Sequence, residues 1–199
     1  MRLVSFAGLV CFCALLASCA ELPQRASSDL DWRDREVQLK ALSHWKASGK
    51  IAIRSAEQSE SATMEWDQAN NITRILLSGP MGLGAVSIAS DENSLQISQN
   101  GESQHYDISS GSSERAVVGW DLPLQALPYW VLGLPAPREP VQEQVVEQGL
   151  LRRVKQLGWT VTYEGYDQFA QYLLPTRLKI ERNDTRARLI IRKWSGFSN

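Results

Sequence analysis

From Gly49 onward, apolar and polar residues alternate with a period of two, and this pattern constrains the fold more than any other feature of the chain. In the run 62–67, for example, Met64 and Trp66 alternate with Glu65 and Asp67. Because successive side chains of a strand point to opposite faces of a sheet, such a run has one apolar and one polar face. The pattern predicts antiparallel strands with one packed face and one face in water.

Turn signals separate these runs at intervals of about 8–12 residues, as in a meander of antiparallel strands. Asn100-Gly101 is the strongest signal, because both residues accept the positive φ angles of a two-residue hairpin. A sheet of about eleven strands must curl, so the predicted fold is mainly β (α+β), a curled antiparallel half-barrel. The strands are expected near residues 49–54, 62–67, 72–78, 85–89, 95–97, 106–108, 150–156, 159–164, 178–182 and 186–194.

Two helical segments are predicted in the middle of the chain, between the two sets of strands. Residues 112–118 begin at a Ser, and residues 124–132 are entered through Pro123 and end at Gly133. Pro-rich extended chain follows. Helices inserted in this way must cover part of the sheet, so residues 111–135 are expected to form a lid over an apolar cavity.

A third helix is predicted near the start of the folded domain. Residues 29–43 carry apolar side chains loosely at helical spacing among charges. Ser28 or Asp29 is the expected N-cap.

The first nineteen residues, MRLVSFAGLVCFCALLASC, predict an export signal. Arg2 is its only charge, and the apolar run is shorter than the roughly 20 residues needed to span a bilayer. The ending Leu16-Ala17-Ser18-Cys19 resembles the bacterial lipobox, in which the Cys becomes the acylated first residue. An ordinary secretory peptide that happens to end near a Cys is the alternative.

The lipobox divides the chain into residues 1–18 as signal peptide, 19–28 as lipidated Cys and tether, and 29–199 as a single domain. The chain has three Cys, and only Cys19 would remain after cleavage, blocked as a thioether. The mature domain would therefore hold no disulfide and depend on its core. In the lipoproteins that the signal resembles, Asp after the Cys often retains the product in the inner membrane, so Ala20 favours the outer membrane.

The formal net charge of −1 does not suggest a nucleic-acid partner. The C-terminal strands nevertheless concentrate cations against only two acids, Glu181 and Asp184. A solvated strand face explains this cluster most simply, and a patch for phospholipid headgroups or an acidic partner is the alternative. The cations are Arg177, Lys179, Arg182, Arg186, Arg188, Arg192 and Lys193.

The stretch SGPMGLG at residues 78–84 has the Gly and Pro of a turn, yet its bulky side chains are apolar. Turn tips lie in water and usually carry Asn, Asp or Ser. Met81 and Leu83 either fold back onto the core of the domain or meet an apolar partner outside it.

The run Asp121–Pro135, DLPLQALPYWVLGLP, resembles the hallmark segment of the LolB family of outer-membrane lipoprotein-insertion factors. Further matches follow the same order along nearly the whole chain. They are the lipobox at Cys19, Gly49 opening the first strand, Trp66-Asp67-Gln68, Gly79-Pro80-Met81-Gly82, Trp159, and Tyr163-Glu164-Gly165-Tyr166.

The resemblance implies a half-open antiparallel β-barrel with a helical lid over an apolar cavity. Such a protein is a monomer that takes lipoproteins from the soluble periplasmic carrier LolA and inserts them into outer-membrane phospholipid without nucleotide. It implies no cofactor apart from the N-acyl and S-diacylglycerol groups on Cys19. It also implies a membrane-insertion loop of Pro80, Met81, Gly82 and Leu83, with Met81 where the family commonly has Leu.

The apolar sides of the strands and of the lid are the candidate lining for lipoprotein acyl chains. For each of these residues, an ordinary place in the core is the alternative. The candidates are Ile53, Met64, Trp66, Ile75, Leu77, Val86, Ile88, Leu95 and Ile97 from the strands and Leu124, Leu127 and Trp130 from the lid.

Two other classes of protein are rivals to an insertion factor. A lipid-anchored scaffold that binds envelope proteins would have a solid core and would bury its apolar loop against a partner. A lipid-anchored hydrolase would need a nucleophile and a base, but the sequence has no G-x-S-x-G, no HExxH and no Cys/His metal spacing. We therefore expect no catalytic residues.

Overall fold

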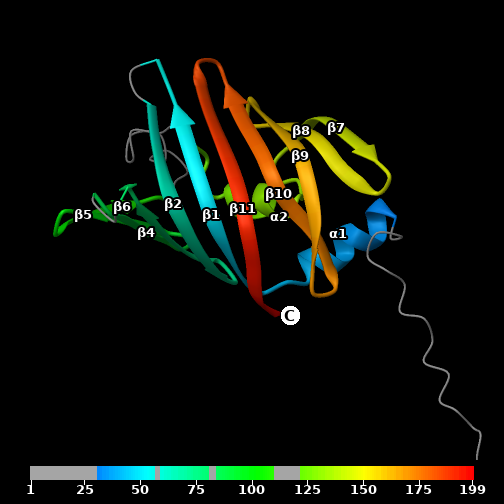
Figure 1. Ribbon diagram of the computed structural model, residues 1–199, viewed down its shortest axis with the longest axis horizontal. Helices are drawn as coiled ribbons and strands as arrows, with labels where there is room; N and C mark the ends of the chain where they lie inside the picture. The colour runs from blue at the N-terminus through cyan, green and yellow to red at the C-terminus, as the bar shows by residue number, and fades with distance from the viewer. Residues whose placement is uncertain (1–30, 57–58, 81–83, 110–121) are drawn as a thin grey trace, which may run out of the picture.

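The computed structural model describes residues 31–56, 59–80, 84–109 and 122–199, and most of them form one antiparallel sheet (Figure 1). The sheet is curled and open, as the sequence predicts. Its strands are β1 (His44–Arg54), β2 (Ser59–Ala69), β3 (Ile72–Ser78), β4 (Val86–Ser90), β5 (Ser94–Gln99), β6 (Glu102–Asp107), β7 (Val141–Glu147), β8 (Leu150–Gln156), β9 (Trp159–Phe169), β10 (Tyr172–Arg182) and β11 (Thr185–Ser198).

The strand order is β6-β5-β4-β3-β2-β1-β11-β10-β9-β8-β7, so the sheet consists of two meanders joined where β1 pairs with β11. Strands β6 and β7 are the two free edges. The chain between them must therefore pass from one edge of the open sheet to the other. This connection carries the short helix α2 (Leu127–Leu132), which lies behind β10 and β11 on the inner side of the curl (Figure 1).

Strand β7 is absent from the sequence-based prediction, and the reason is its exposure. Its side chains are exposed or only half-buried along its whole length, so no alternation of apolar and polar residues marks it. Strands β9, β10 and β11 also extend beyond their predicted ends. The predicted helix at 112–118 lies outside the described residues.

The register places alternate connections at opposite ends of the strands. The end that carries the β1–β2, β3–β4, β5–β6, β8–β9 and β10–β11 connections is called the loop rim. The other end, the opposite rim, carries the remaining hairpin turns and the end of β11.

Helix α1 (Trp32–Lys40) lies at the opposite rim, beside β9 and β10 (Figure 1). It is shorter than predicted, and its N-cap is Asp31, whose side chain accepts a hydrogen bond from the Asp34 N–H at 2.9 Å. Its buried side chains are Leu39 and the unpredicted Arg35, whereas Val37 is exposed. Arg35 donates to the carbonyl oxygens of Gly149 at 2.9 Å and Leu173 at 3.2 Å, which ties the helix to two strand ends.

Gly49 lies at an irregularity in the β1–β11 pairing, where the register shifts between Ser48 and Gly49. A Cβ atom at this position would lie 2.0 Å from the carbonyl oxygen of Ile190. Only glycine lets the two backbones approach this closely.

We predict that Gly49→Ala lowers the free energy of unfolding by about 3 kcal/mol or more, because the methyl group would force β1 away from β11. Chemical denaturation followed by circular dichroism measures this loss. Ala52→Ser, an exposed change on the same strand, is the control and should stay within about 0.5 kcal/mol of the wild type. Equal stability of the two variants would contradict the close contact.

Candidate functional site

The candidate site is the apolar inner face of the curled sheet together with α2. All twelve predicted lining residues belong to one apolar cluster in the structure. From the strands, Ile53, Met64, Trp66, Ile75, Leu77, Ile88, Leu95 and Ile97 are buried and Val86 is partly buried, while from the lid Leu127 and Trp130 are buried and Leu124 is partly buried. The structure thus brings them together, and their contact with acyl chains stays a prediction.

Helix α2 ends where the sequence predicts, at Gly133. This glycine has a φ of 83° and its N–H bonds to the Trp130 carbonyl, so it caps the helix in the left-handed conformation. A Cβ atom at Gly133 would meet the Tyr166 hydroxyl at 3.1 Å and the Pro175 ring at 3.3 Å. The end of the helix is therefore packed tightly against β9 and β10.

The amide of Gln156 fastens α2 and the chain after it to β8. Its Oε1 accepts hydrogen bonds from Trp130 Nε1 at 3.1 Å and from the Ala136 N–H at 2.9 Å. Its Nε2 donates to the carbonyl oxygens of Ala136 at 3.0 Å and Glu139 at 2.9 Å. Gln156 is fully buried, and all its hydrogen-bonding capacity is used on one short stretch of chain.

Two tyrosines of β9 complete this attachment. Tyr163 donates its hydroxyl hydrogen to the Trp130 carbonyl at 2.8 Å, and Tyr166 donates to the Leu151 carbonyl at 2.6 Å. Burial raises the pKa of both phenols, so both hydroxyls stay neutral and can donate. The neighbouring Tyr166 raises the pKa of Tyr163 further, whereas Arg152 and Arg35 partly offset the increase at Tyr166. The resemblance marked these residues, but their hydrogen-bond partners are visible only in the structure.

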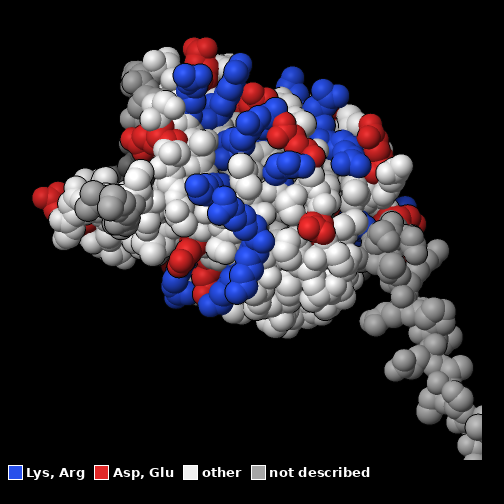
Figure 2. Space-filling model, in the orientation of Figure 1, with Lys and Arg blue, Asp and Glu red and all other residues white. Residues whose placement is uncertain are grey.

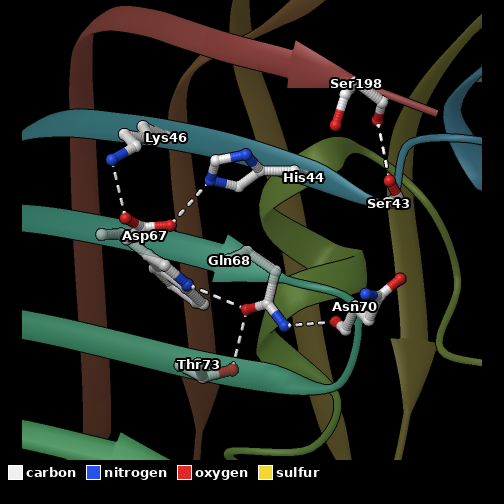
Figure 3. Close-up of polar contacts among 9 residues, drawn as sticks. Ser43, His44, Lys46, Asp67, Gln68, Asn70, Thr73 and Ser198 are labelled. Carbon is white, nitrogen blue, oxygen red and sulfur yellow. Dashed lines mark hydrogen bonds and ion pairs between the residues drawn. The ribbon is translucent and has the colours of Figure 1, made fainter.

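Gln68 of β2, near the opposite rim, is a second buried amide that bonds to an indole N–H, as Gln156 does (Figure 3). Its Oε1 accepts from Trp66 Nε1 at 3.1 Å and from the Thr73 hydroxyl at 2.7 Å, and its Nε2 donates to the Asn70 carbonyl at 2.8 Å. Gln68 and Gln156 were not predicted as functional. Each is an amide at the inward-facing position of an alternating strand, and that signal could have identified them.

On the outer face the same strands carry ion pairs. Asp67 accepts from His44 Nε2 at 2.9 Å and Lys46 Nζ at 2.8 Å, and the hydrogen bond with Lys46 lowers the pKa of Asp67 (Figure 3). Glu164 contacts Lys179 and, at 3.9 Å, Arg188, and the hydrogen bond with Lys179 lowers the pKa of Glu164.

The predicted basic cluster lies largely on this outer face, over β10 and β11, where Lys and Arg side chains gather (Figure 2). Like charges meet across strands, since Arg54 lies opposite Arg186 and Lys179 opposite Arg188. Glu181 partly offsets the first pair through its contact with Arg186 at 3.3 Å. Arg182 instead places its guanidinium 4.4 Å from the centre of the Trp159 ring.

A shallow groove of about 360 Å³ crosses the outer face of β11, β1, β2, β3 and β4. Short side chains such as Ser48, Ser87 and Ala89 leave it open, and Lys46, Asp67 and other charged groups line it. The groove therefore combines charged groups with apolar ones such as Leu76, whereas the inner face is an almost wholly apolar cluster.

The predicted membrane-insertion loop emerges at the loop rim between Leu77 and Val86, which pair across β3 and β4. Pro80 is exposed there. Met81, Gly82, Leu83 and the predicted lipid-attachment residue Cys19 lie outside the described residues. Neither described helix has the length and apolar character needed to span a bilayer.

Comparison with protein families gives one clear match. The family model described as "Outer membrane lipoprotein LolB" matches residues 43–194. Proteins named "Outer-membrane lipoprotein LolB" from Chromohalobacter salexigens and Cellvibrio japonicus are 34% and 33% identical to this chain. Each alignment covers 94% of this chain, and the two cover 88% and 96% of the relatives.

Solved structures share the fold at low sequence identity. A LolA superfamily protein from Nitrosomonas europaea matches with a TM-score of 0.53 and 9% identity, over 83% of this chain and 93% of its own. A domain of outer-membrane lipoprotein-sorting type from Vibrio parahaemolyticus matches with a TM-score of 0.56 and 12% identity, over 83% and 89% of the two chains.

We predict that Gln156→Leu lowers the free energy of unfolding by about 3 kcal/mol, because it leaves the buried Trp130 and Ala136 N–H groups without acceptors. Hydrogen exchange of the α2 amides should accelerate at the same time. Gln144→Leu, an exposed change on the neighbouring strand β7, is the matched control. A loss below about 1 kcal/mol, with unchanged exchange, would show that Gln156 does not hold the helix.

Proposed function

The chain belongs to the LolB family of outer membrane lipoproteins, and we propose on this basis that it receives lipoproteins from the periplasmic carrier LolA and inserts them into the outer membrane. The observation that carries the proposal is the continuous apolar cluster shared by the inner face of the sheet and α2. This cluster is the part of the fold suited to binding acyl chains.

The physical need for such a surface follows from the cargo. Exposing an acyl chain to water costs about 0.8 kcal/mol per methylene, so a multiply acylated protein cannot cross the periplasm unshielded. A carrier must also release its cargo, which favours a lining without strong polar attachment points.

The buried polar side chains of the inner face meet this second requirement. The amides of Gln68 and Gln156 and the hydroxyl of Tyr163 make hydrogen bonds within the protein. Because these groups are already satisfied, an acyl chain on this face would meet mainly methyl, methylene and aromatic groups. Binding would then depend on buried area rather than on a specific headgroup, and no nucleotide is needed for release.

Cys19 is the proposed point of attachment to the outer membrane, through N-acyl and S-diacylglycerol groups on the mature N-terminus. Removal of residues 1–18 would leave residues 20–28 as a tether, with the folded domain on the periplasmic side. Two acyl signals on one residue are enough for stable anchoring.

Transfer between purified proteins tests this function. The chain without residues 1–19 is mixed with a LolA–lipoprotein complex in the absence of nucleotide, and co-purification shows where the cargo goes. We expect the lipoprotein to move onto this chain. Cargo that stays on a competent carrier, while this chain is folded, would contradict the proposal and favour a scaffold that binds envelope proteins.

The loop of residues 80–83 is the proposed membrane-insertion element, with Met81 leading and Leu83 assisting. Burial of one such side chain contributes roughly 1.5–3 kcal/mol, which is too little to anchor a protein but enough to hold the loop rim against lipid. Pro80 and Gly82 would shape the loop.

We predict that Met81→Glu leaves folding and cargo binding intact but stalls delivery of lipoprotein into vesicles, because a carboxylate opposes entry into the acyl region. Delivery is measured as lipoprotein that floats with phospholipid vesicles. Met81→Leu is the matched control and should deliver normally. Undiminished delivery by Met81→Glu would exclude Met81, and Leu83→Glu in the same assay would then test the second residue.

A further inference from the structure

The turn between β8 and β9 combines an exposed apolar side chain with a backbone conformation that does not suit it. Leu157 and Gly158 have φ angles of 55° and 73°, the left-handed values of a two-residue hairpin turn. Asn, Asp and Gly suit the first position of such a turn, whereas Leu is strained there. Leu157 is nevertheless 37% exposed. The needs of the turn therefore do not explain a Leu at this position.

Two other connections in the sheet have the same geometry and a different chemistry. Asn100-Gly101 and Gln148-Gly149 also have two successive positive φ angles, and each places a polar amide first. Leu157 is the apolar exception among these three turns.

Val141 continues the apolar surface beside this turn. It begins β7 opposite Gln156, the residue that precedes Leu157, and it is 42% exposed. Two exposed apolar side chains therefore lie on neighbouring strand ends.

Cations flank this apolar pair. Lys155 is exposed and has no ion-pair partner within the described residues, since Glu143 opposite it pairs with Arg153 at 3.1 Å. Arg182 also lies beside the turn, because a Cβ atom at Gly158 would lie 3.7 Å from its Cδ. We call Val141, Lys155, Leu157 and Arg182 the β8–β9 patch.

The patch is at the loop rim, the same end of the sheet from which the loop containing Pro80 emerges. Figure 2 shows Lys and Arg side chains gathered along this border of the outer face, over the loop-rim ends of β1, β11 and β10 and on towards β8. The Pro80 loop leaves the other meander, so the two features lie on separate halves of the sheet.

We propose that the β8–β9 patch is a second membrane contact, in which Leu157 and Val141 reach the acyl boundary of a phospholipid layer and Lys155 and Arg182 meet its phosphates. This inference rests on the proposed function, because it requires the loop rim to face the membrane. Two contacts on separate halves of the sheet would fix the orientation of the rim, which one loop alone cannot do.

The chemistry of the patch fits lipid better than a protein partner. A phospholipid surface presents phosphate and acyl carbon within the length of one side chain. The patch likewise has cations and apolar side chains on the same neighbouring strand ends. Anionic lipid adds about a fivefold gain per Lys near the surface, equivalent to about 1 kcal/mol.

The test uses the full chain, held on phospholipid vesicles by its own lipid anchor. Leu157→Cys carries a fluorescent label, and quenching by spin-labelled acyl chains is compared with quenching by aqueous iodide. Ile72→Cys is the matched control, because Ile72 is 42% exposed but lies at the opposite rim. The wild-type protein treated with the same label sets the background.

We expect the label at position 157 to be quenched by lipid and protected from iodide, and the label at position 72 to show the reverse. Equal iodide quenching at both positions would overturn the proposal. So would a label at position 157 that is protected only when LolA is added, because the patch would then contact the carrier.

A label on Met81→Cys separates this inference from the proposed function. Lipid quenching at position 81 without quenching at position 157 would overturn the second contact and leave the insertion loop in place. Absence of lipid quenching at both positions would overturn both membrane contacts, whereas cargo transfer from LolA is scored independently.

Two substitutions test the roles within the patch. Leu157→Asn should keep or raise the melting temperature, because Asn suits the left-handed position, and a clear fall would show that Leu157 serves the fold instead. On vesicles with anionic phospholipid, Lys155→Gln should lower about fivefold the ratio of molecules whose β8–β9 turn is inserted in lipid to molecules whose turn is in water. An unchanged ratio for Lys155→Gln on anionic vesicles would exclude the proposed phosphate contact of Lys155.

Discussion

The pairing of β1 with β11 is the interaction on which the rest of the structure depends. It joins a meander from the first half of the chain to a meander from the second, and so makes one sheet from two. Gly49 permits the close backbone approach at its centre. With the two meanders joined in this way, the free edges become β6 and β7, so the chain between them has to join opposite edges of the sheet. The part of this connection that the structure describes places α2 on the inner side of the curl (Figure 1).

The chain around α2 covers part of the apolar inner face, and its polar groups need hydrogen-bond partners there. The chain around α2 brings an indole N–H and several backbone groups into an apolar setting, where each would be costly without a partner. Gln156 and Tyr163 supply those partners from β8 and β9. The same residues that hold the covering chain also leave the lining apolar, which is what an acyl-binding surface requires.

Much of the fold could be predicted because its signals are local. Alternation identified ten of the strands, Asn100-Gly101 marked its hairpin, and Gly133 marked the end of α2. The predictions failed where the local sequence pattern was weak or did not fix the boundary of an element. Strand β7 has no buried face to produce alternation. Helix α1 starts inside the predicted span, because Asp31 caps it through a hydrogen bond from the Asp34 N–H. For the site, the twelve lining residues were predictable as apolar positions. Gln68 and Gln156 could be noticed as amides at inward-facing positions, but their roles could not be predicted, since the sequence does not place their hydrogen-bond partners.

By itself, the sequence determined the antiparallel and mainly β character, the helix that ends at Gly133 and the family, while the export signal and lipobox stay predictions. These depend on residues close together in the chain, or on motifs in a fixed order. Only the tertiary structure decided that β1 pairs with β11, that Gln156 meets Trp130 and Ala136, and that the strained Leu157 turn lies at the same rim as the Pro80 loop. The physical reason is that these contacts join segments far apart in sequence, and a side chain's hydrogen-bond partners and exposure are set by the packing of the whole sheet.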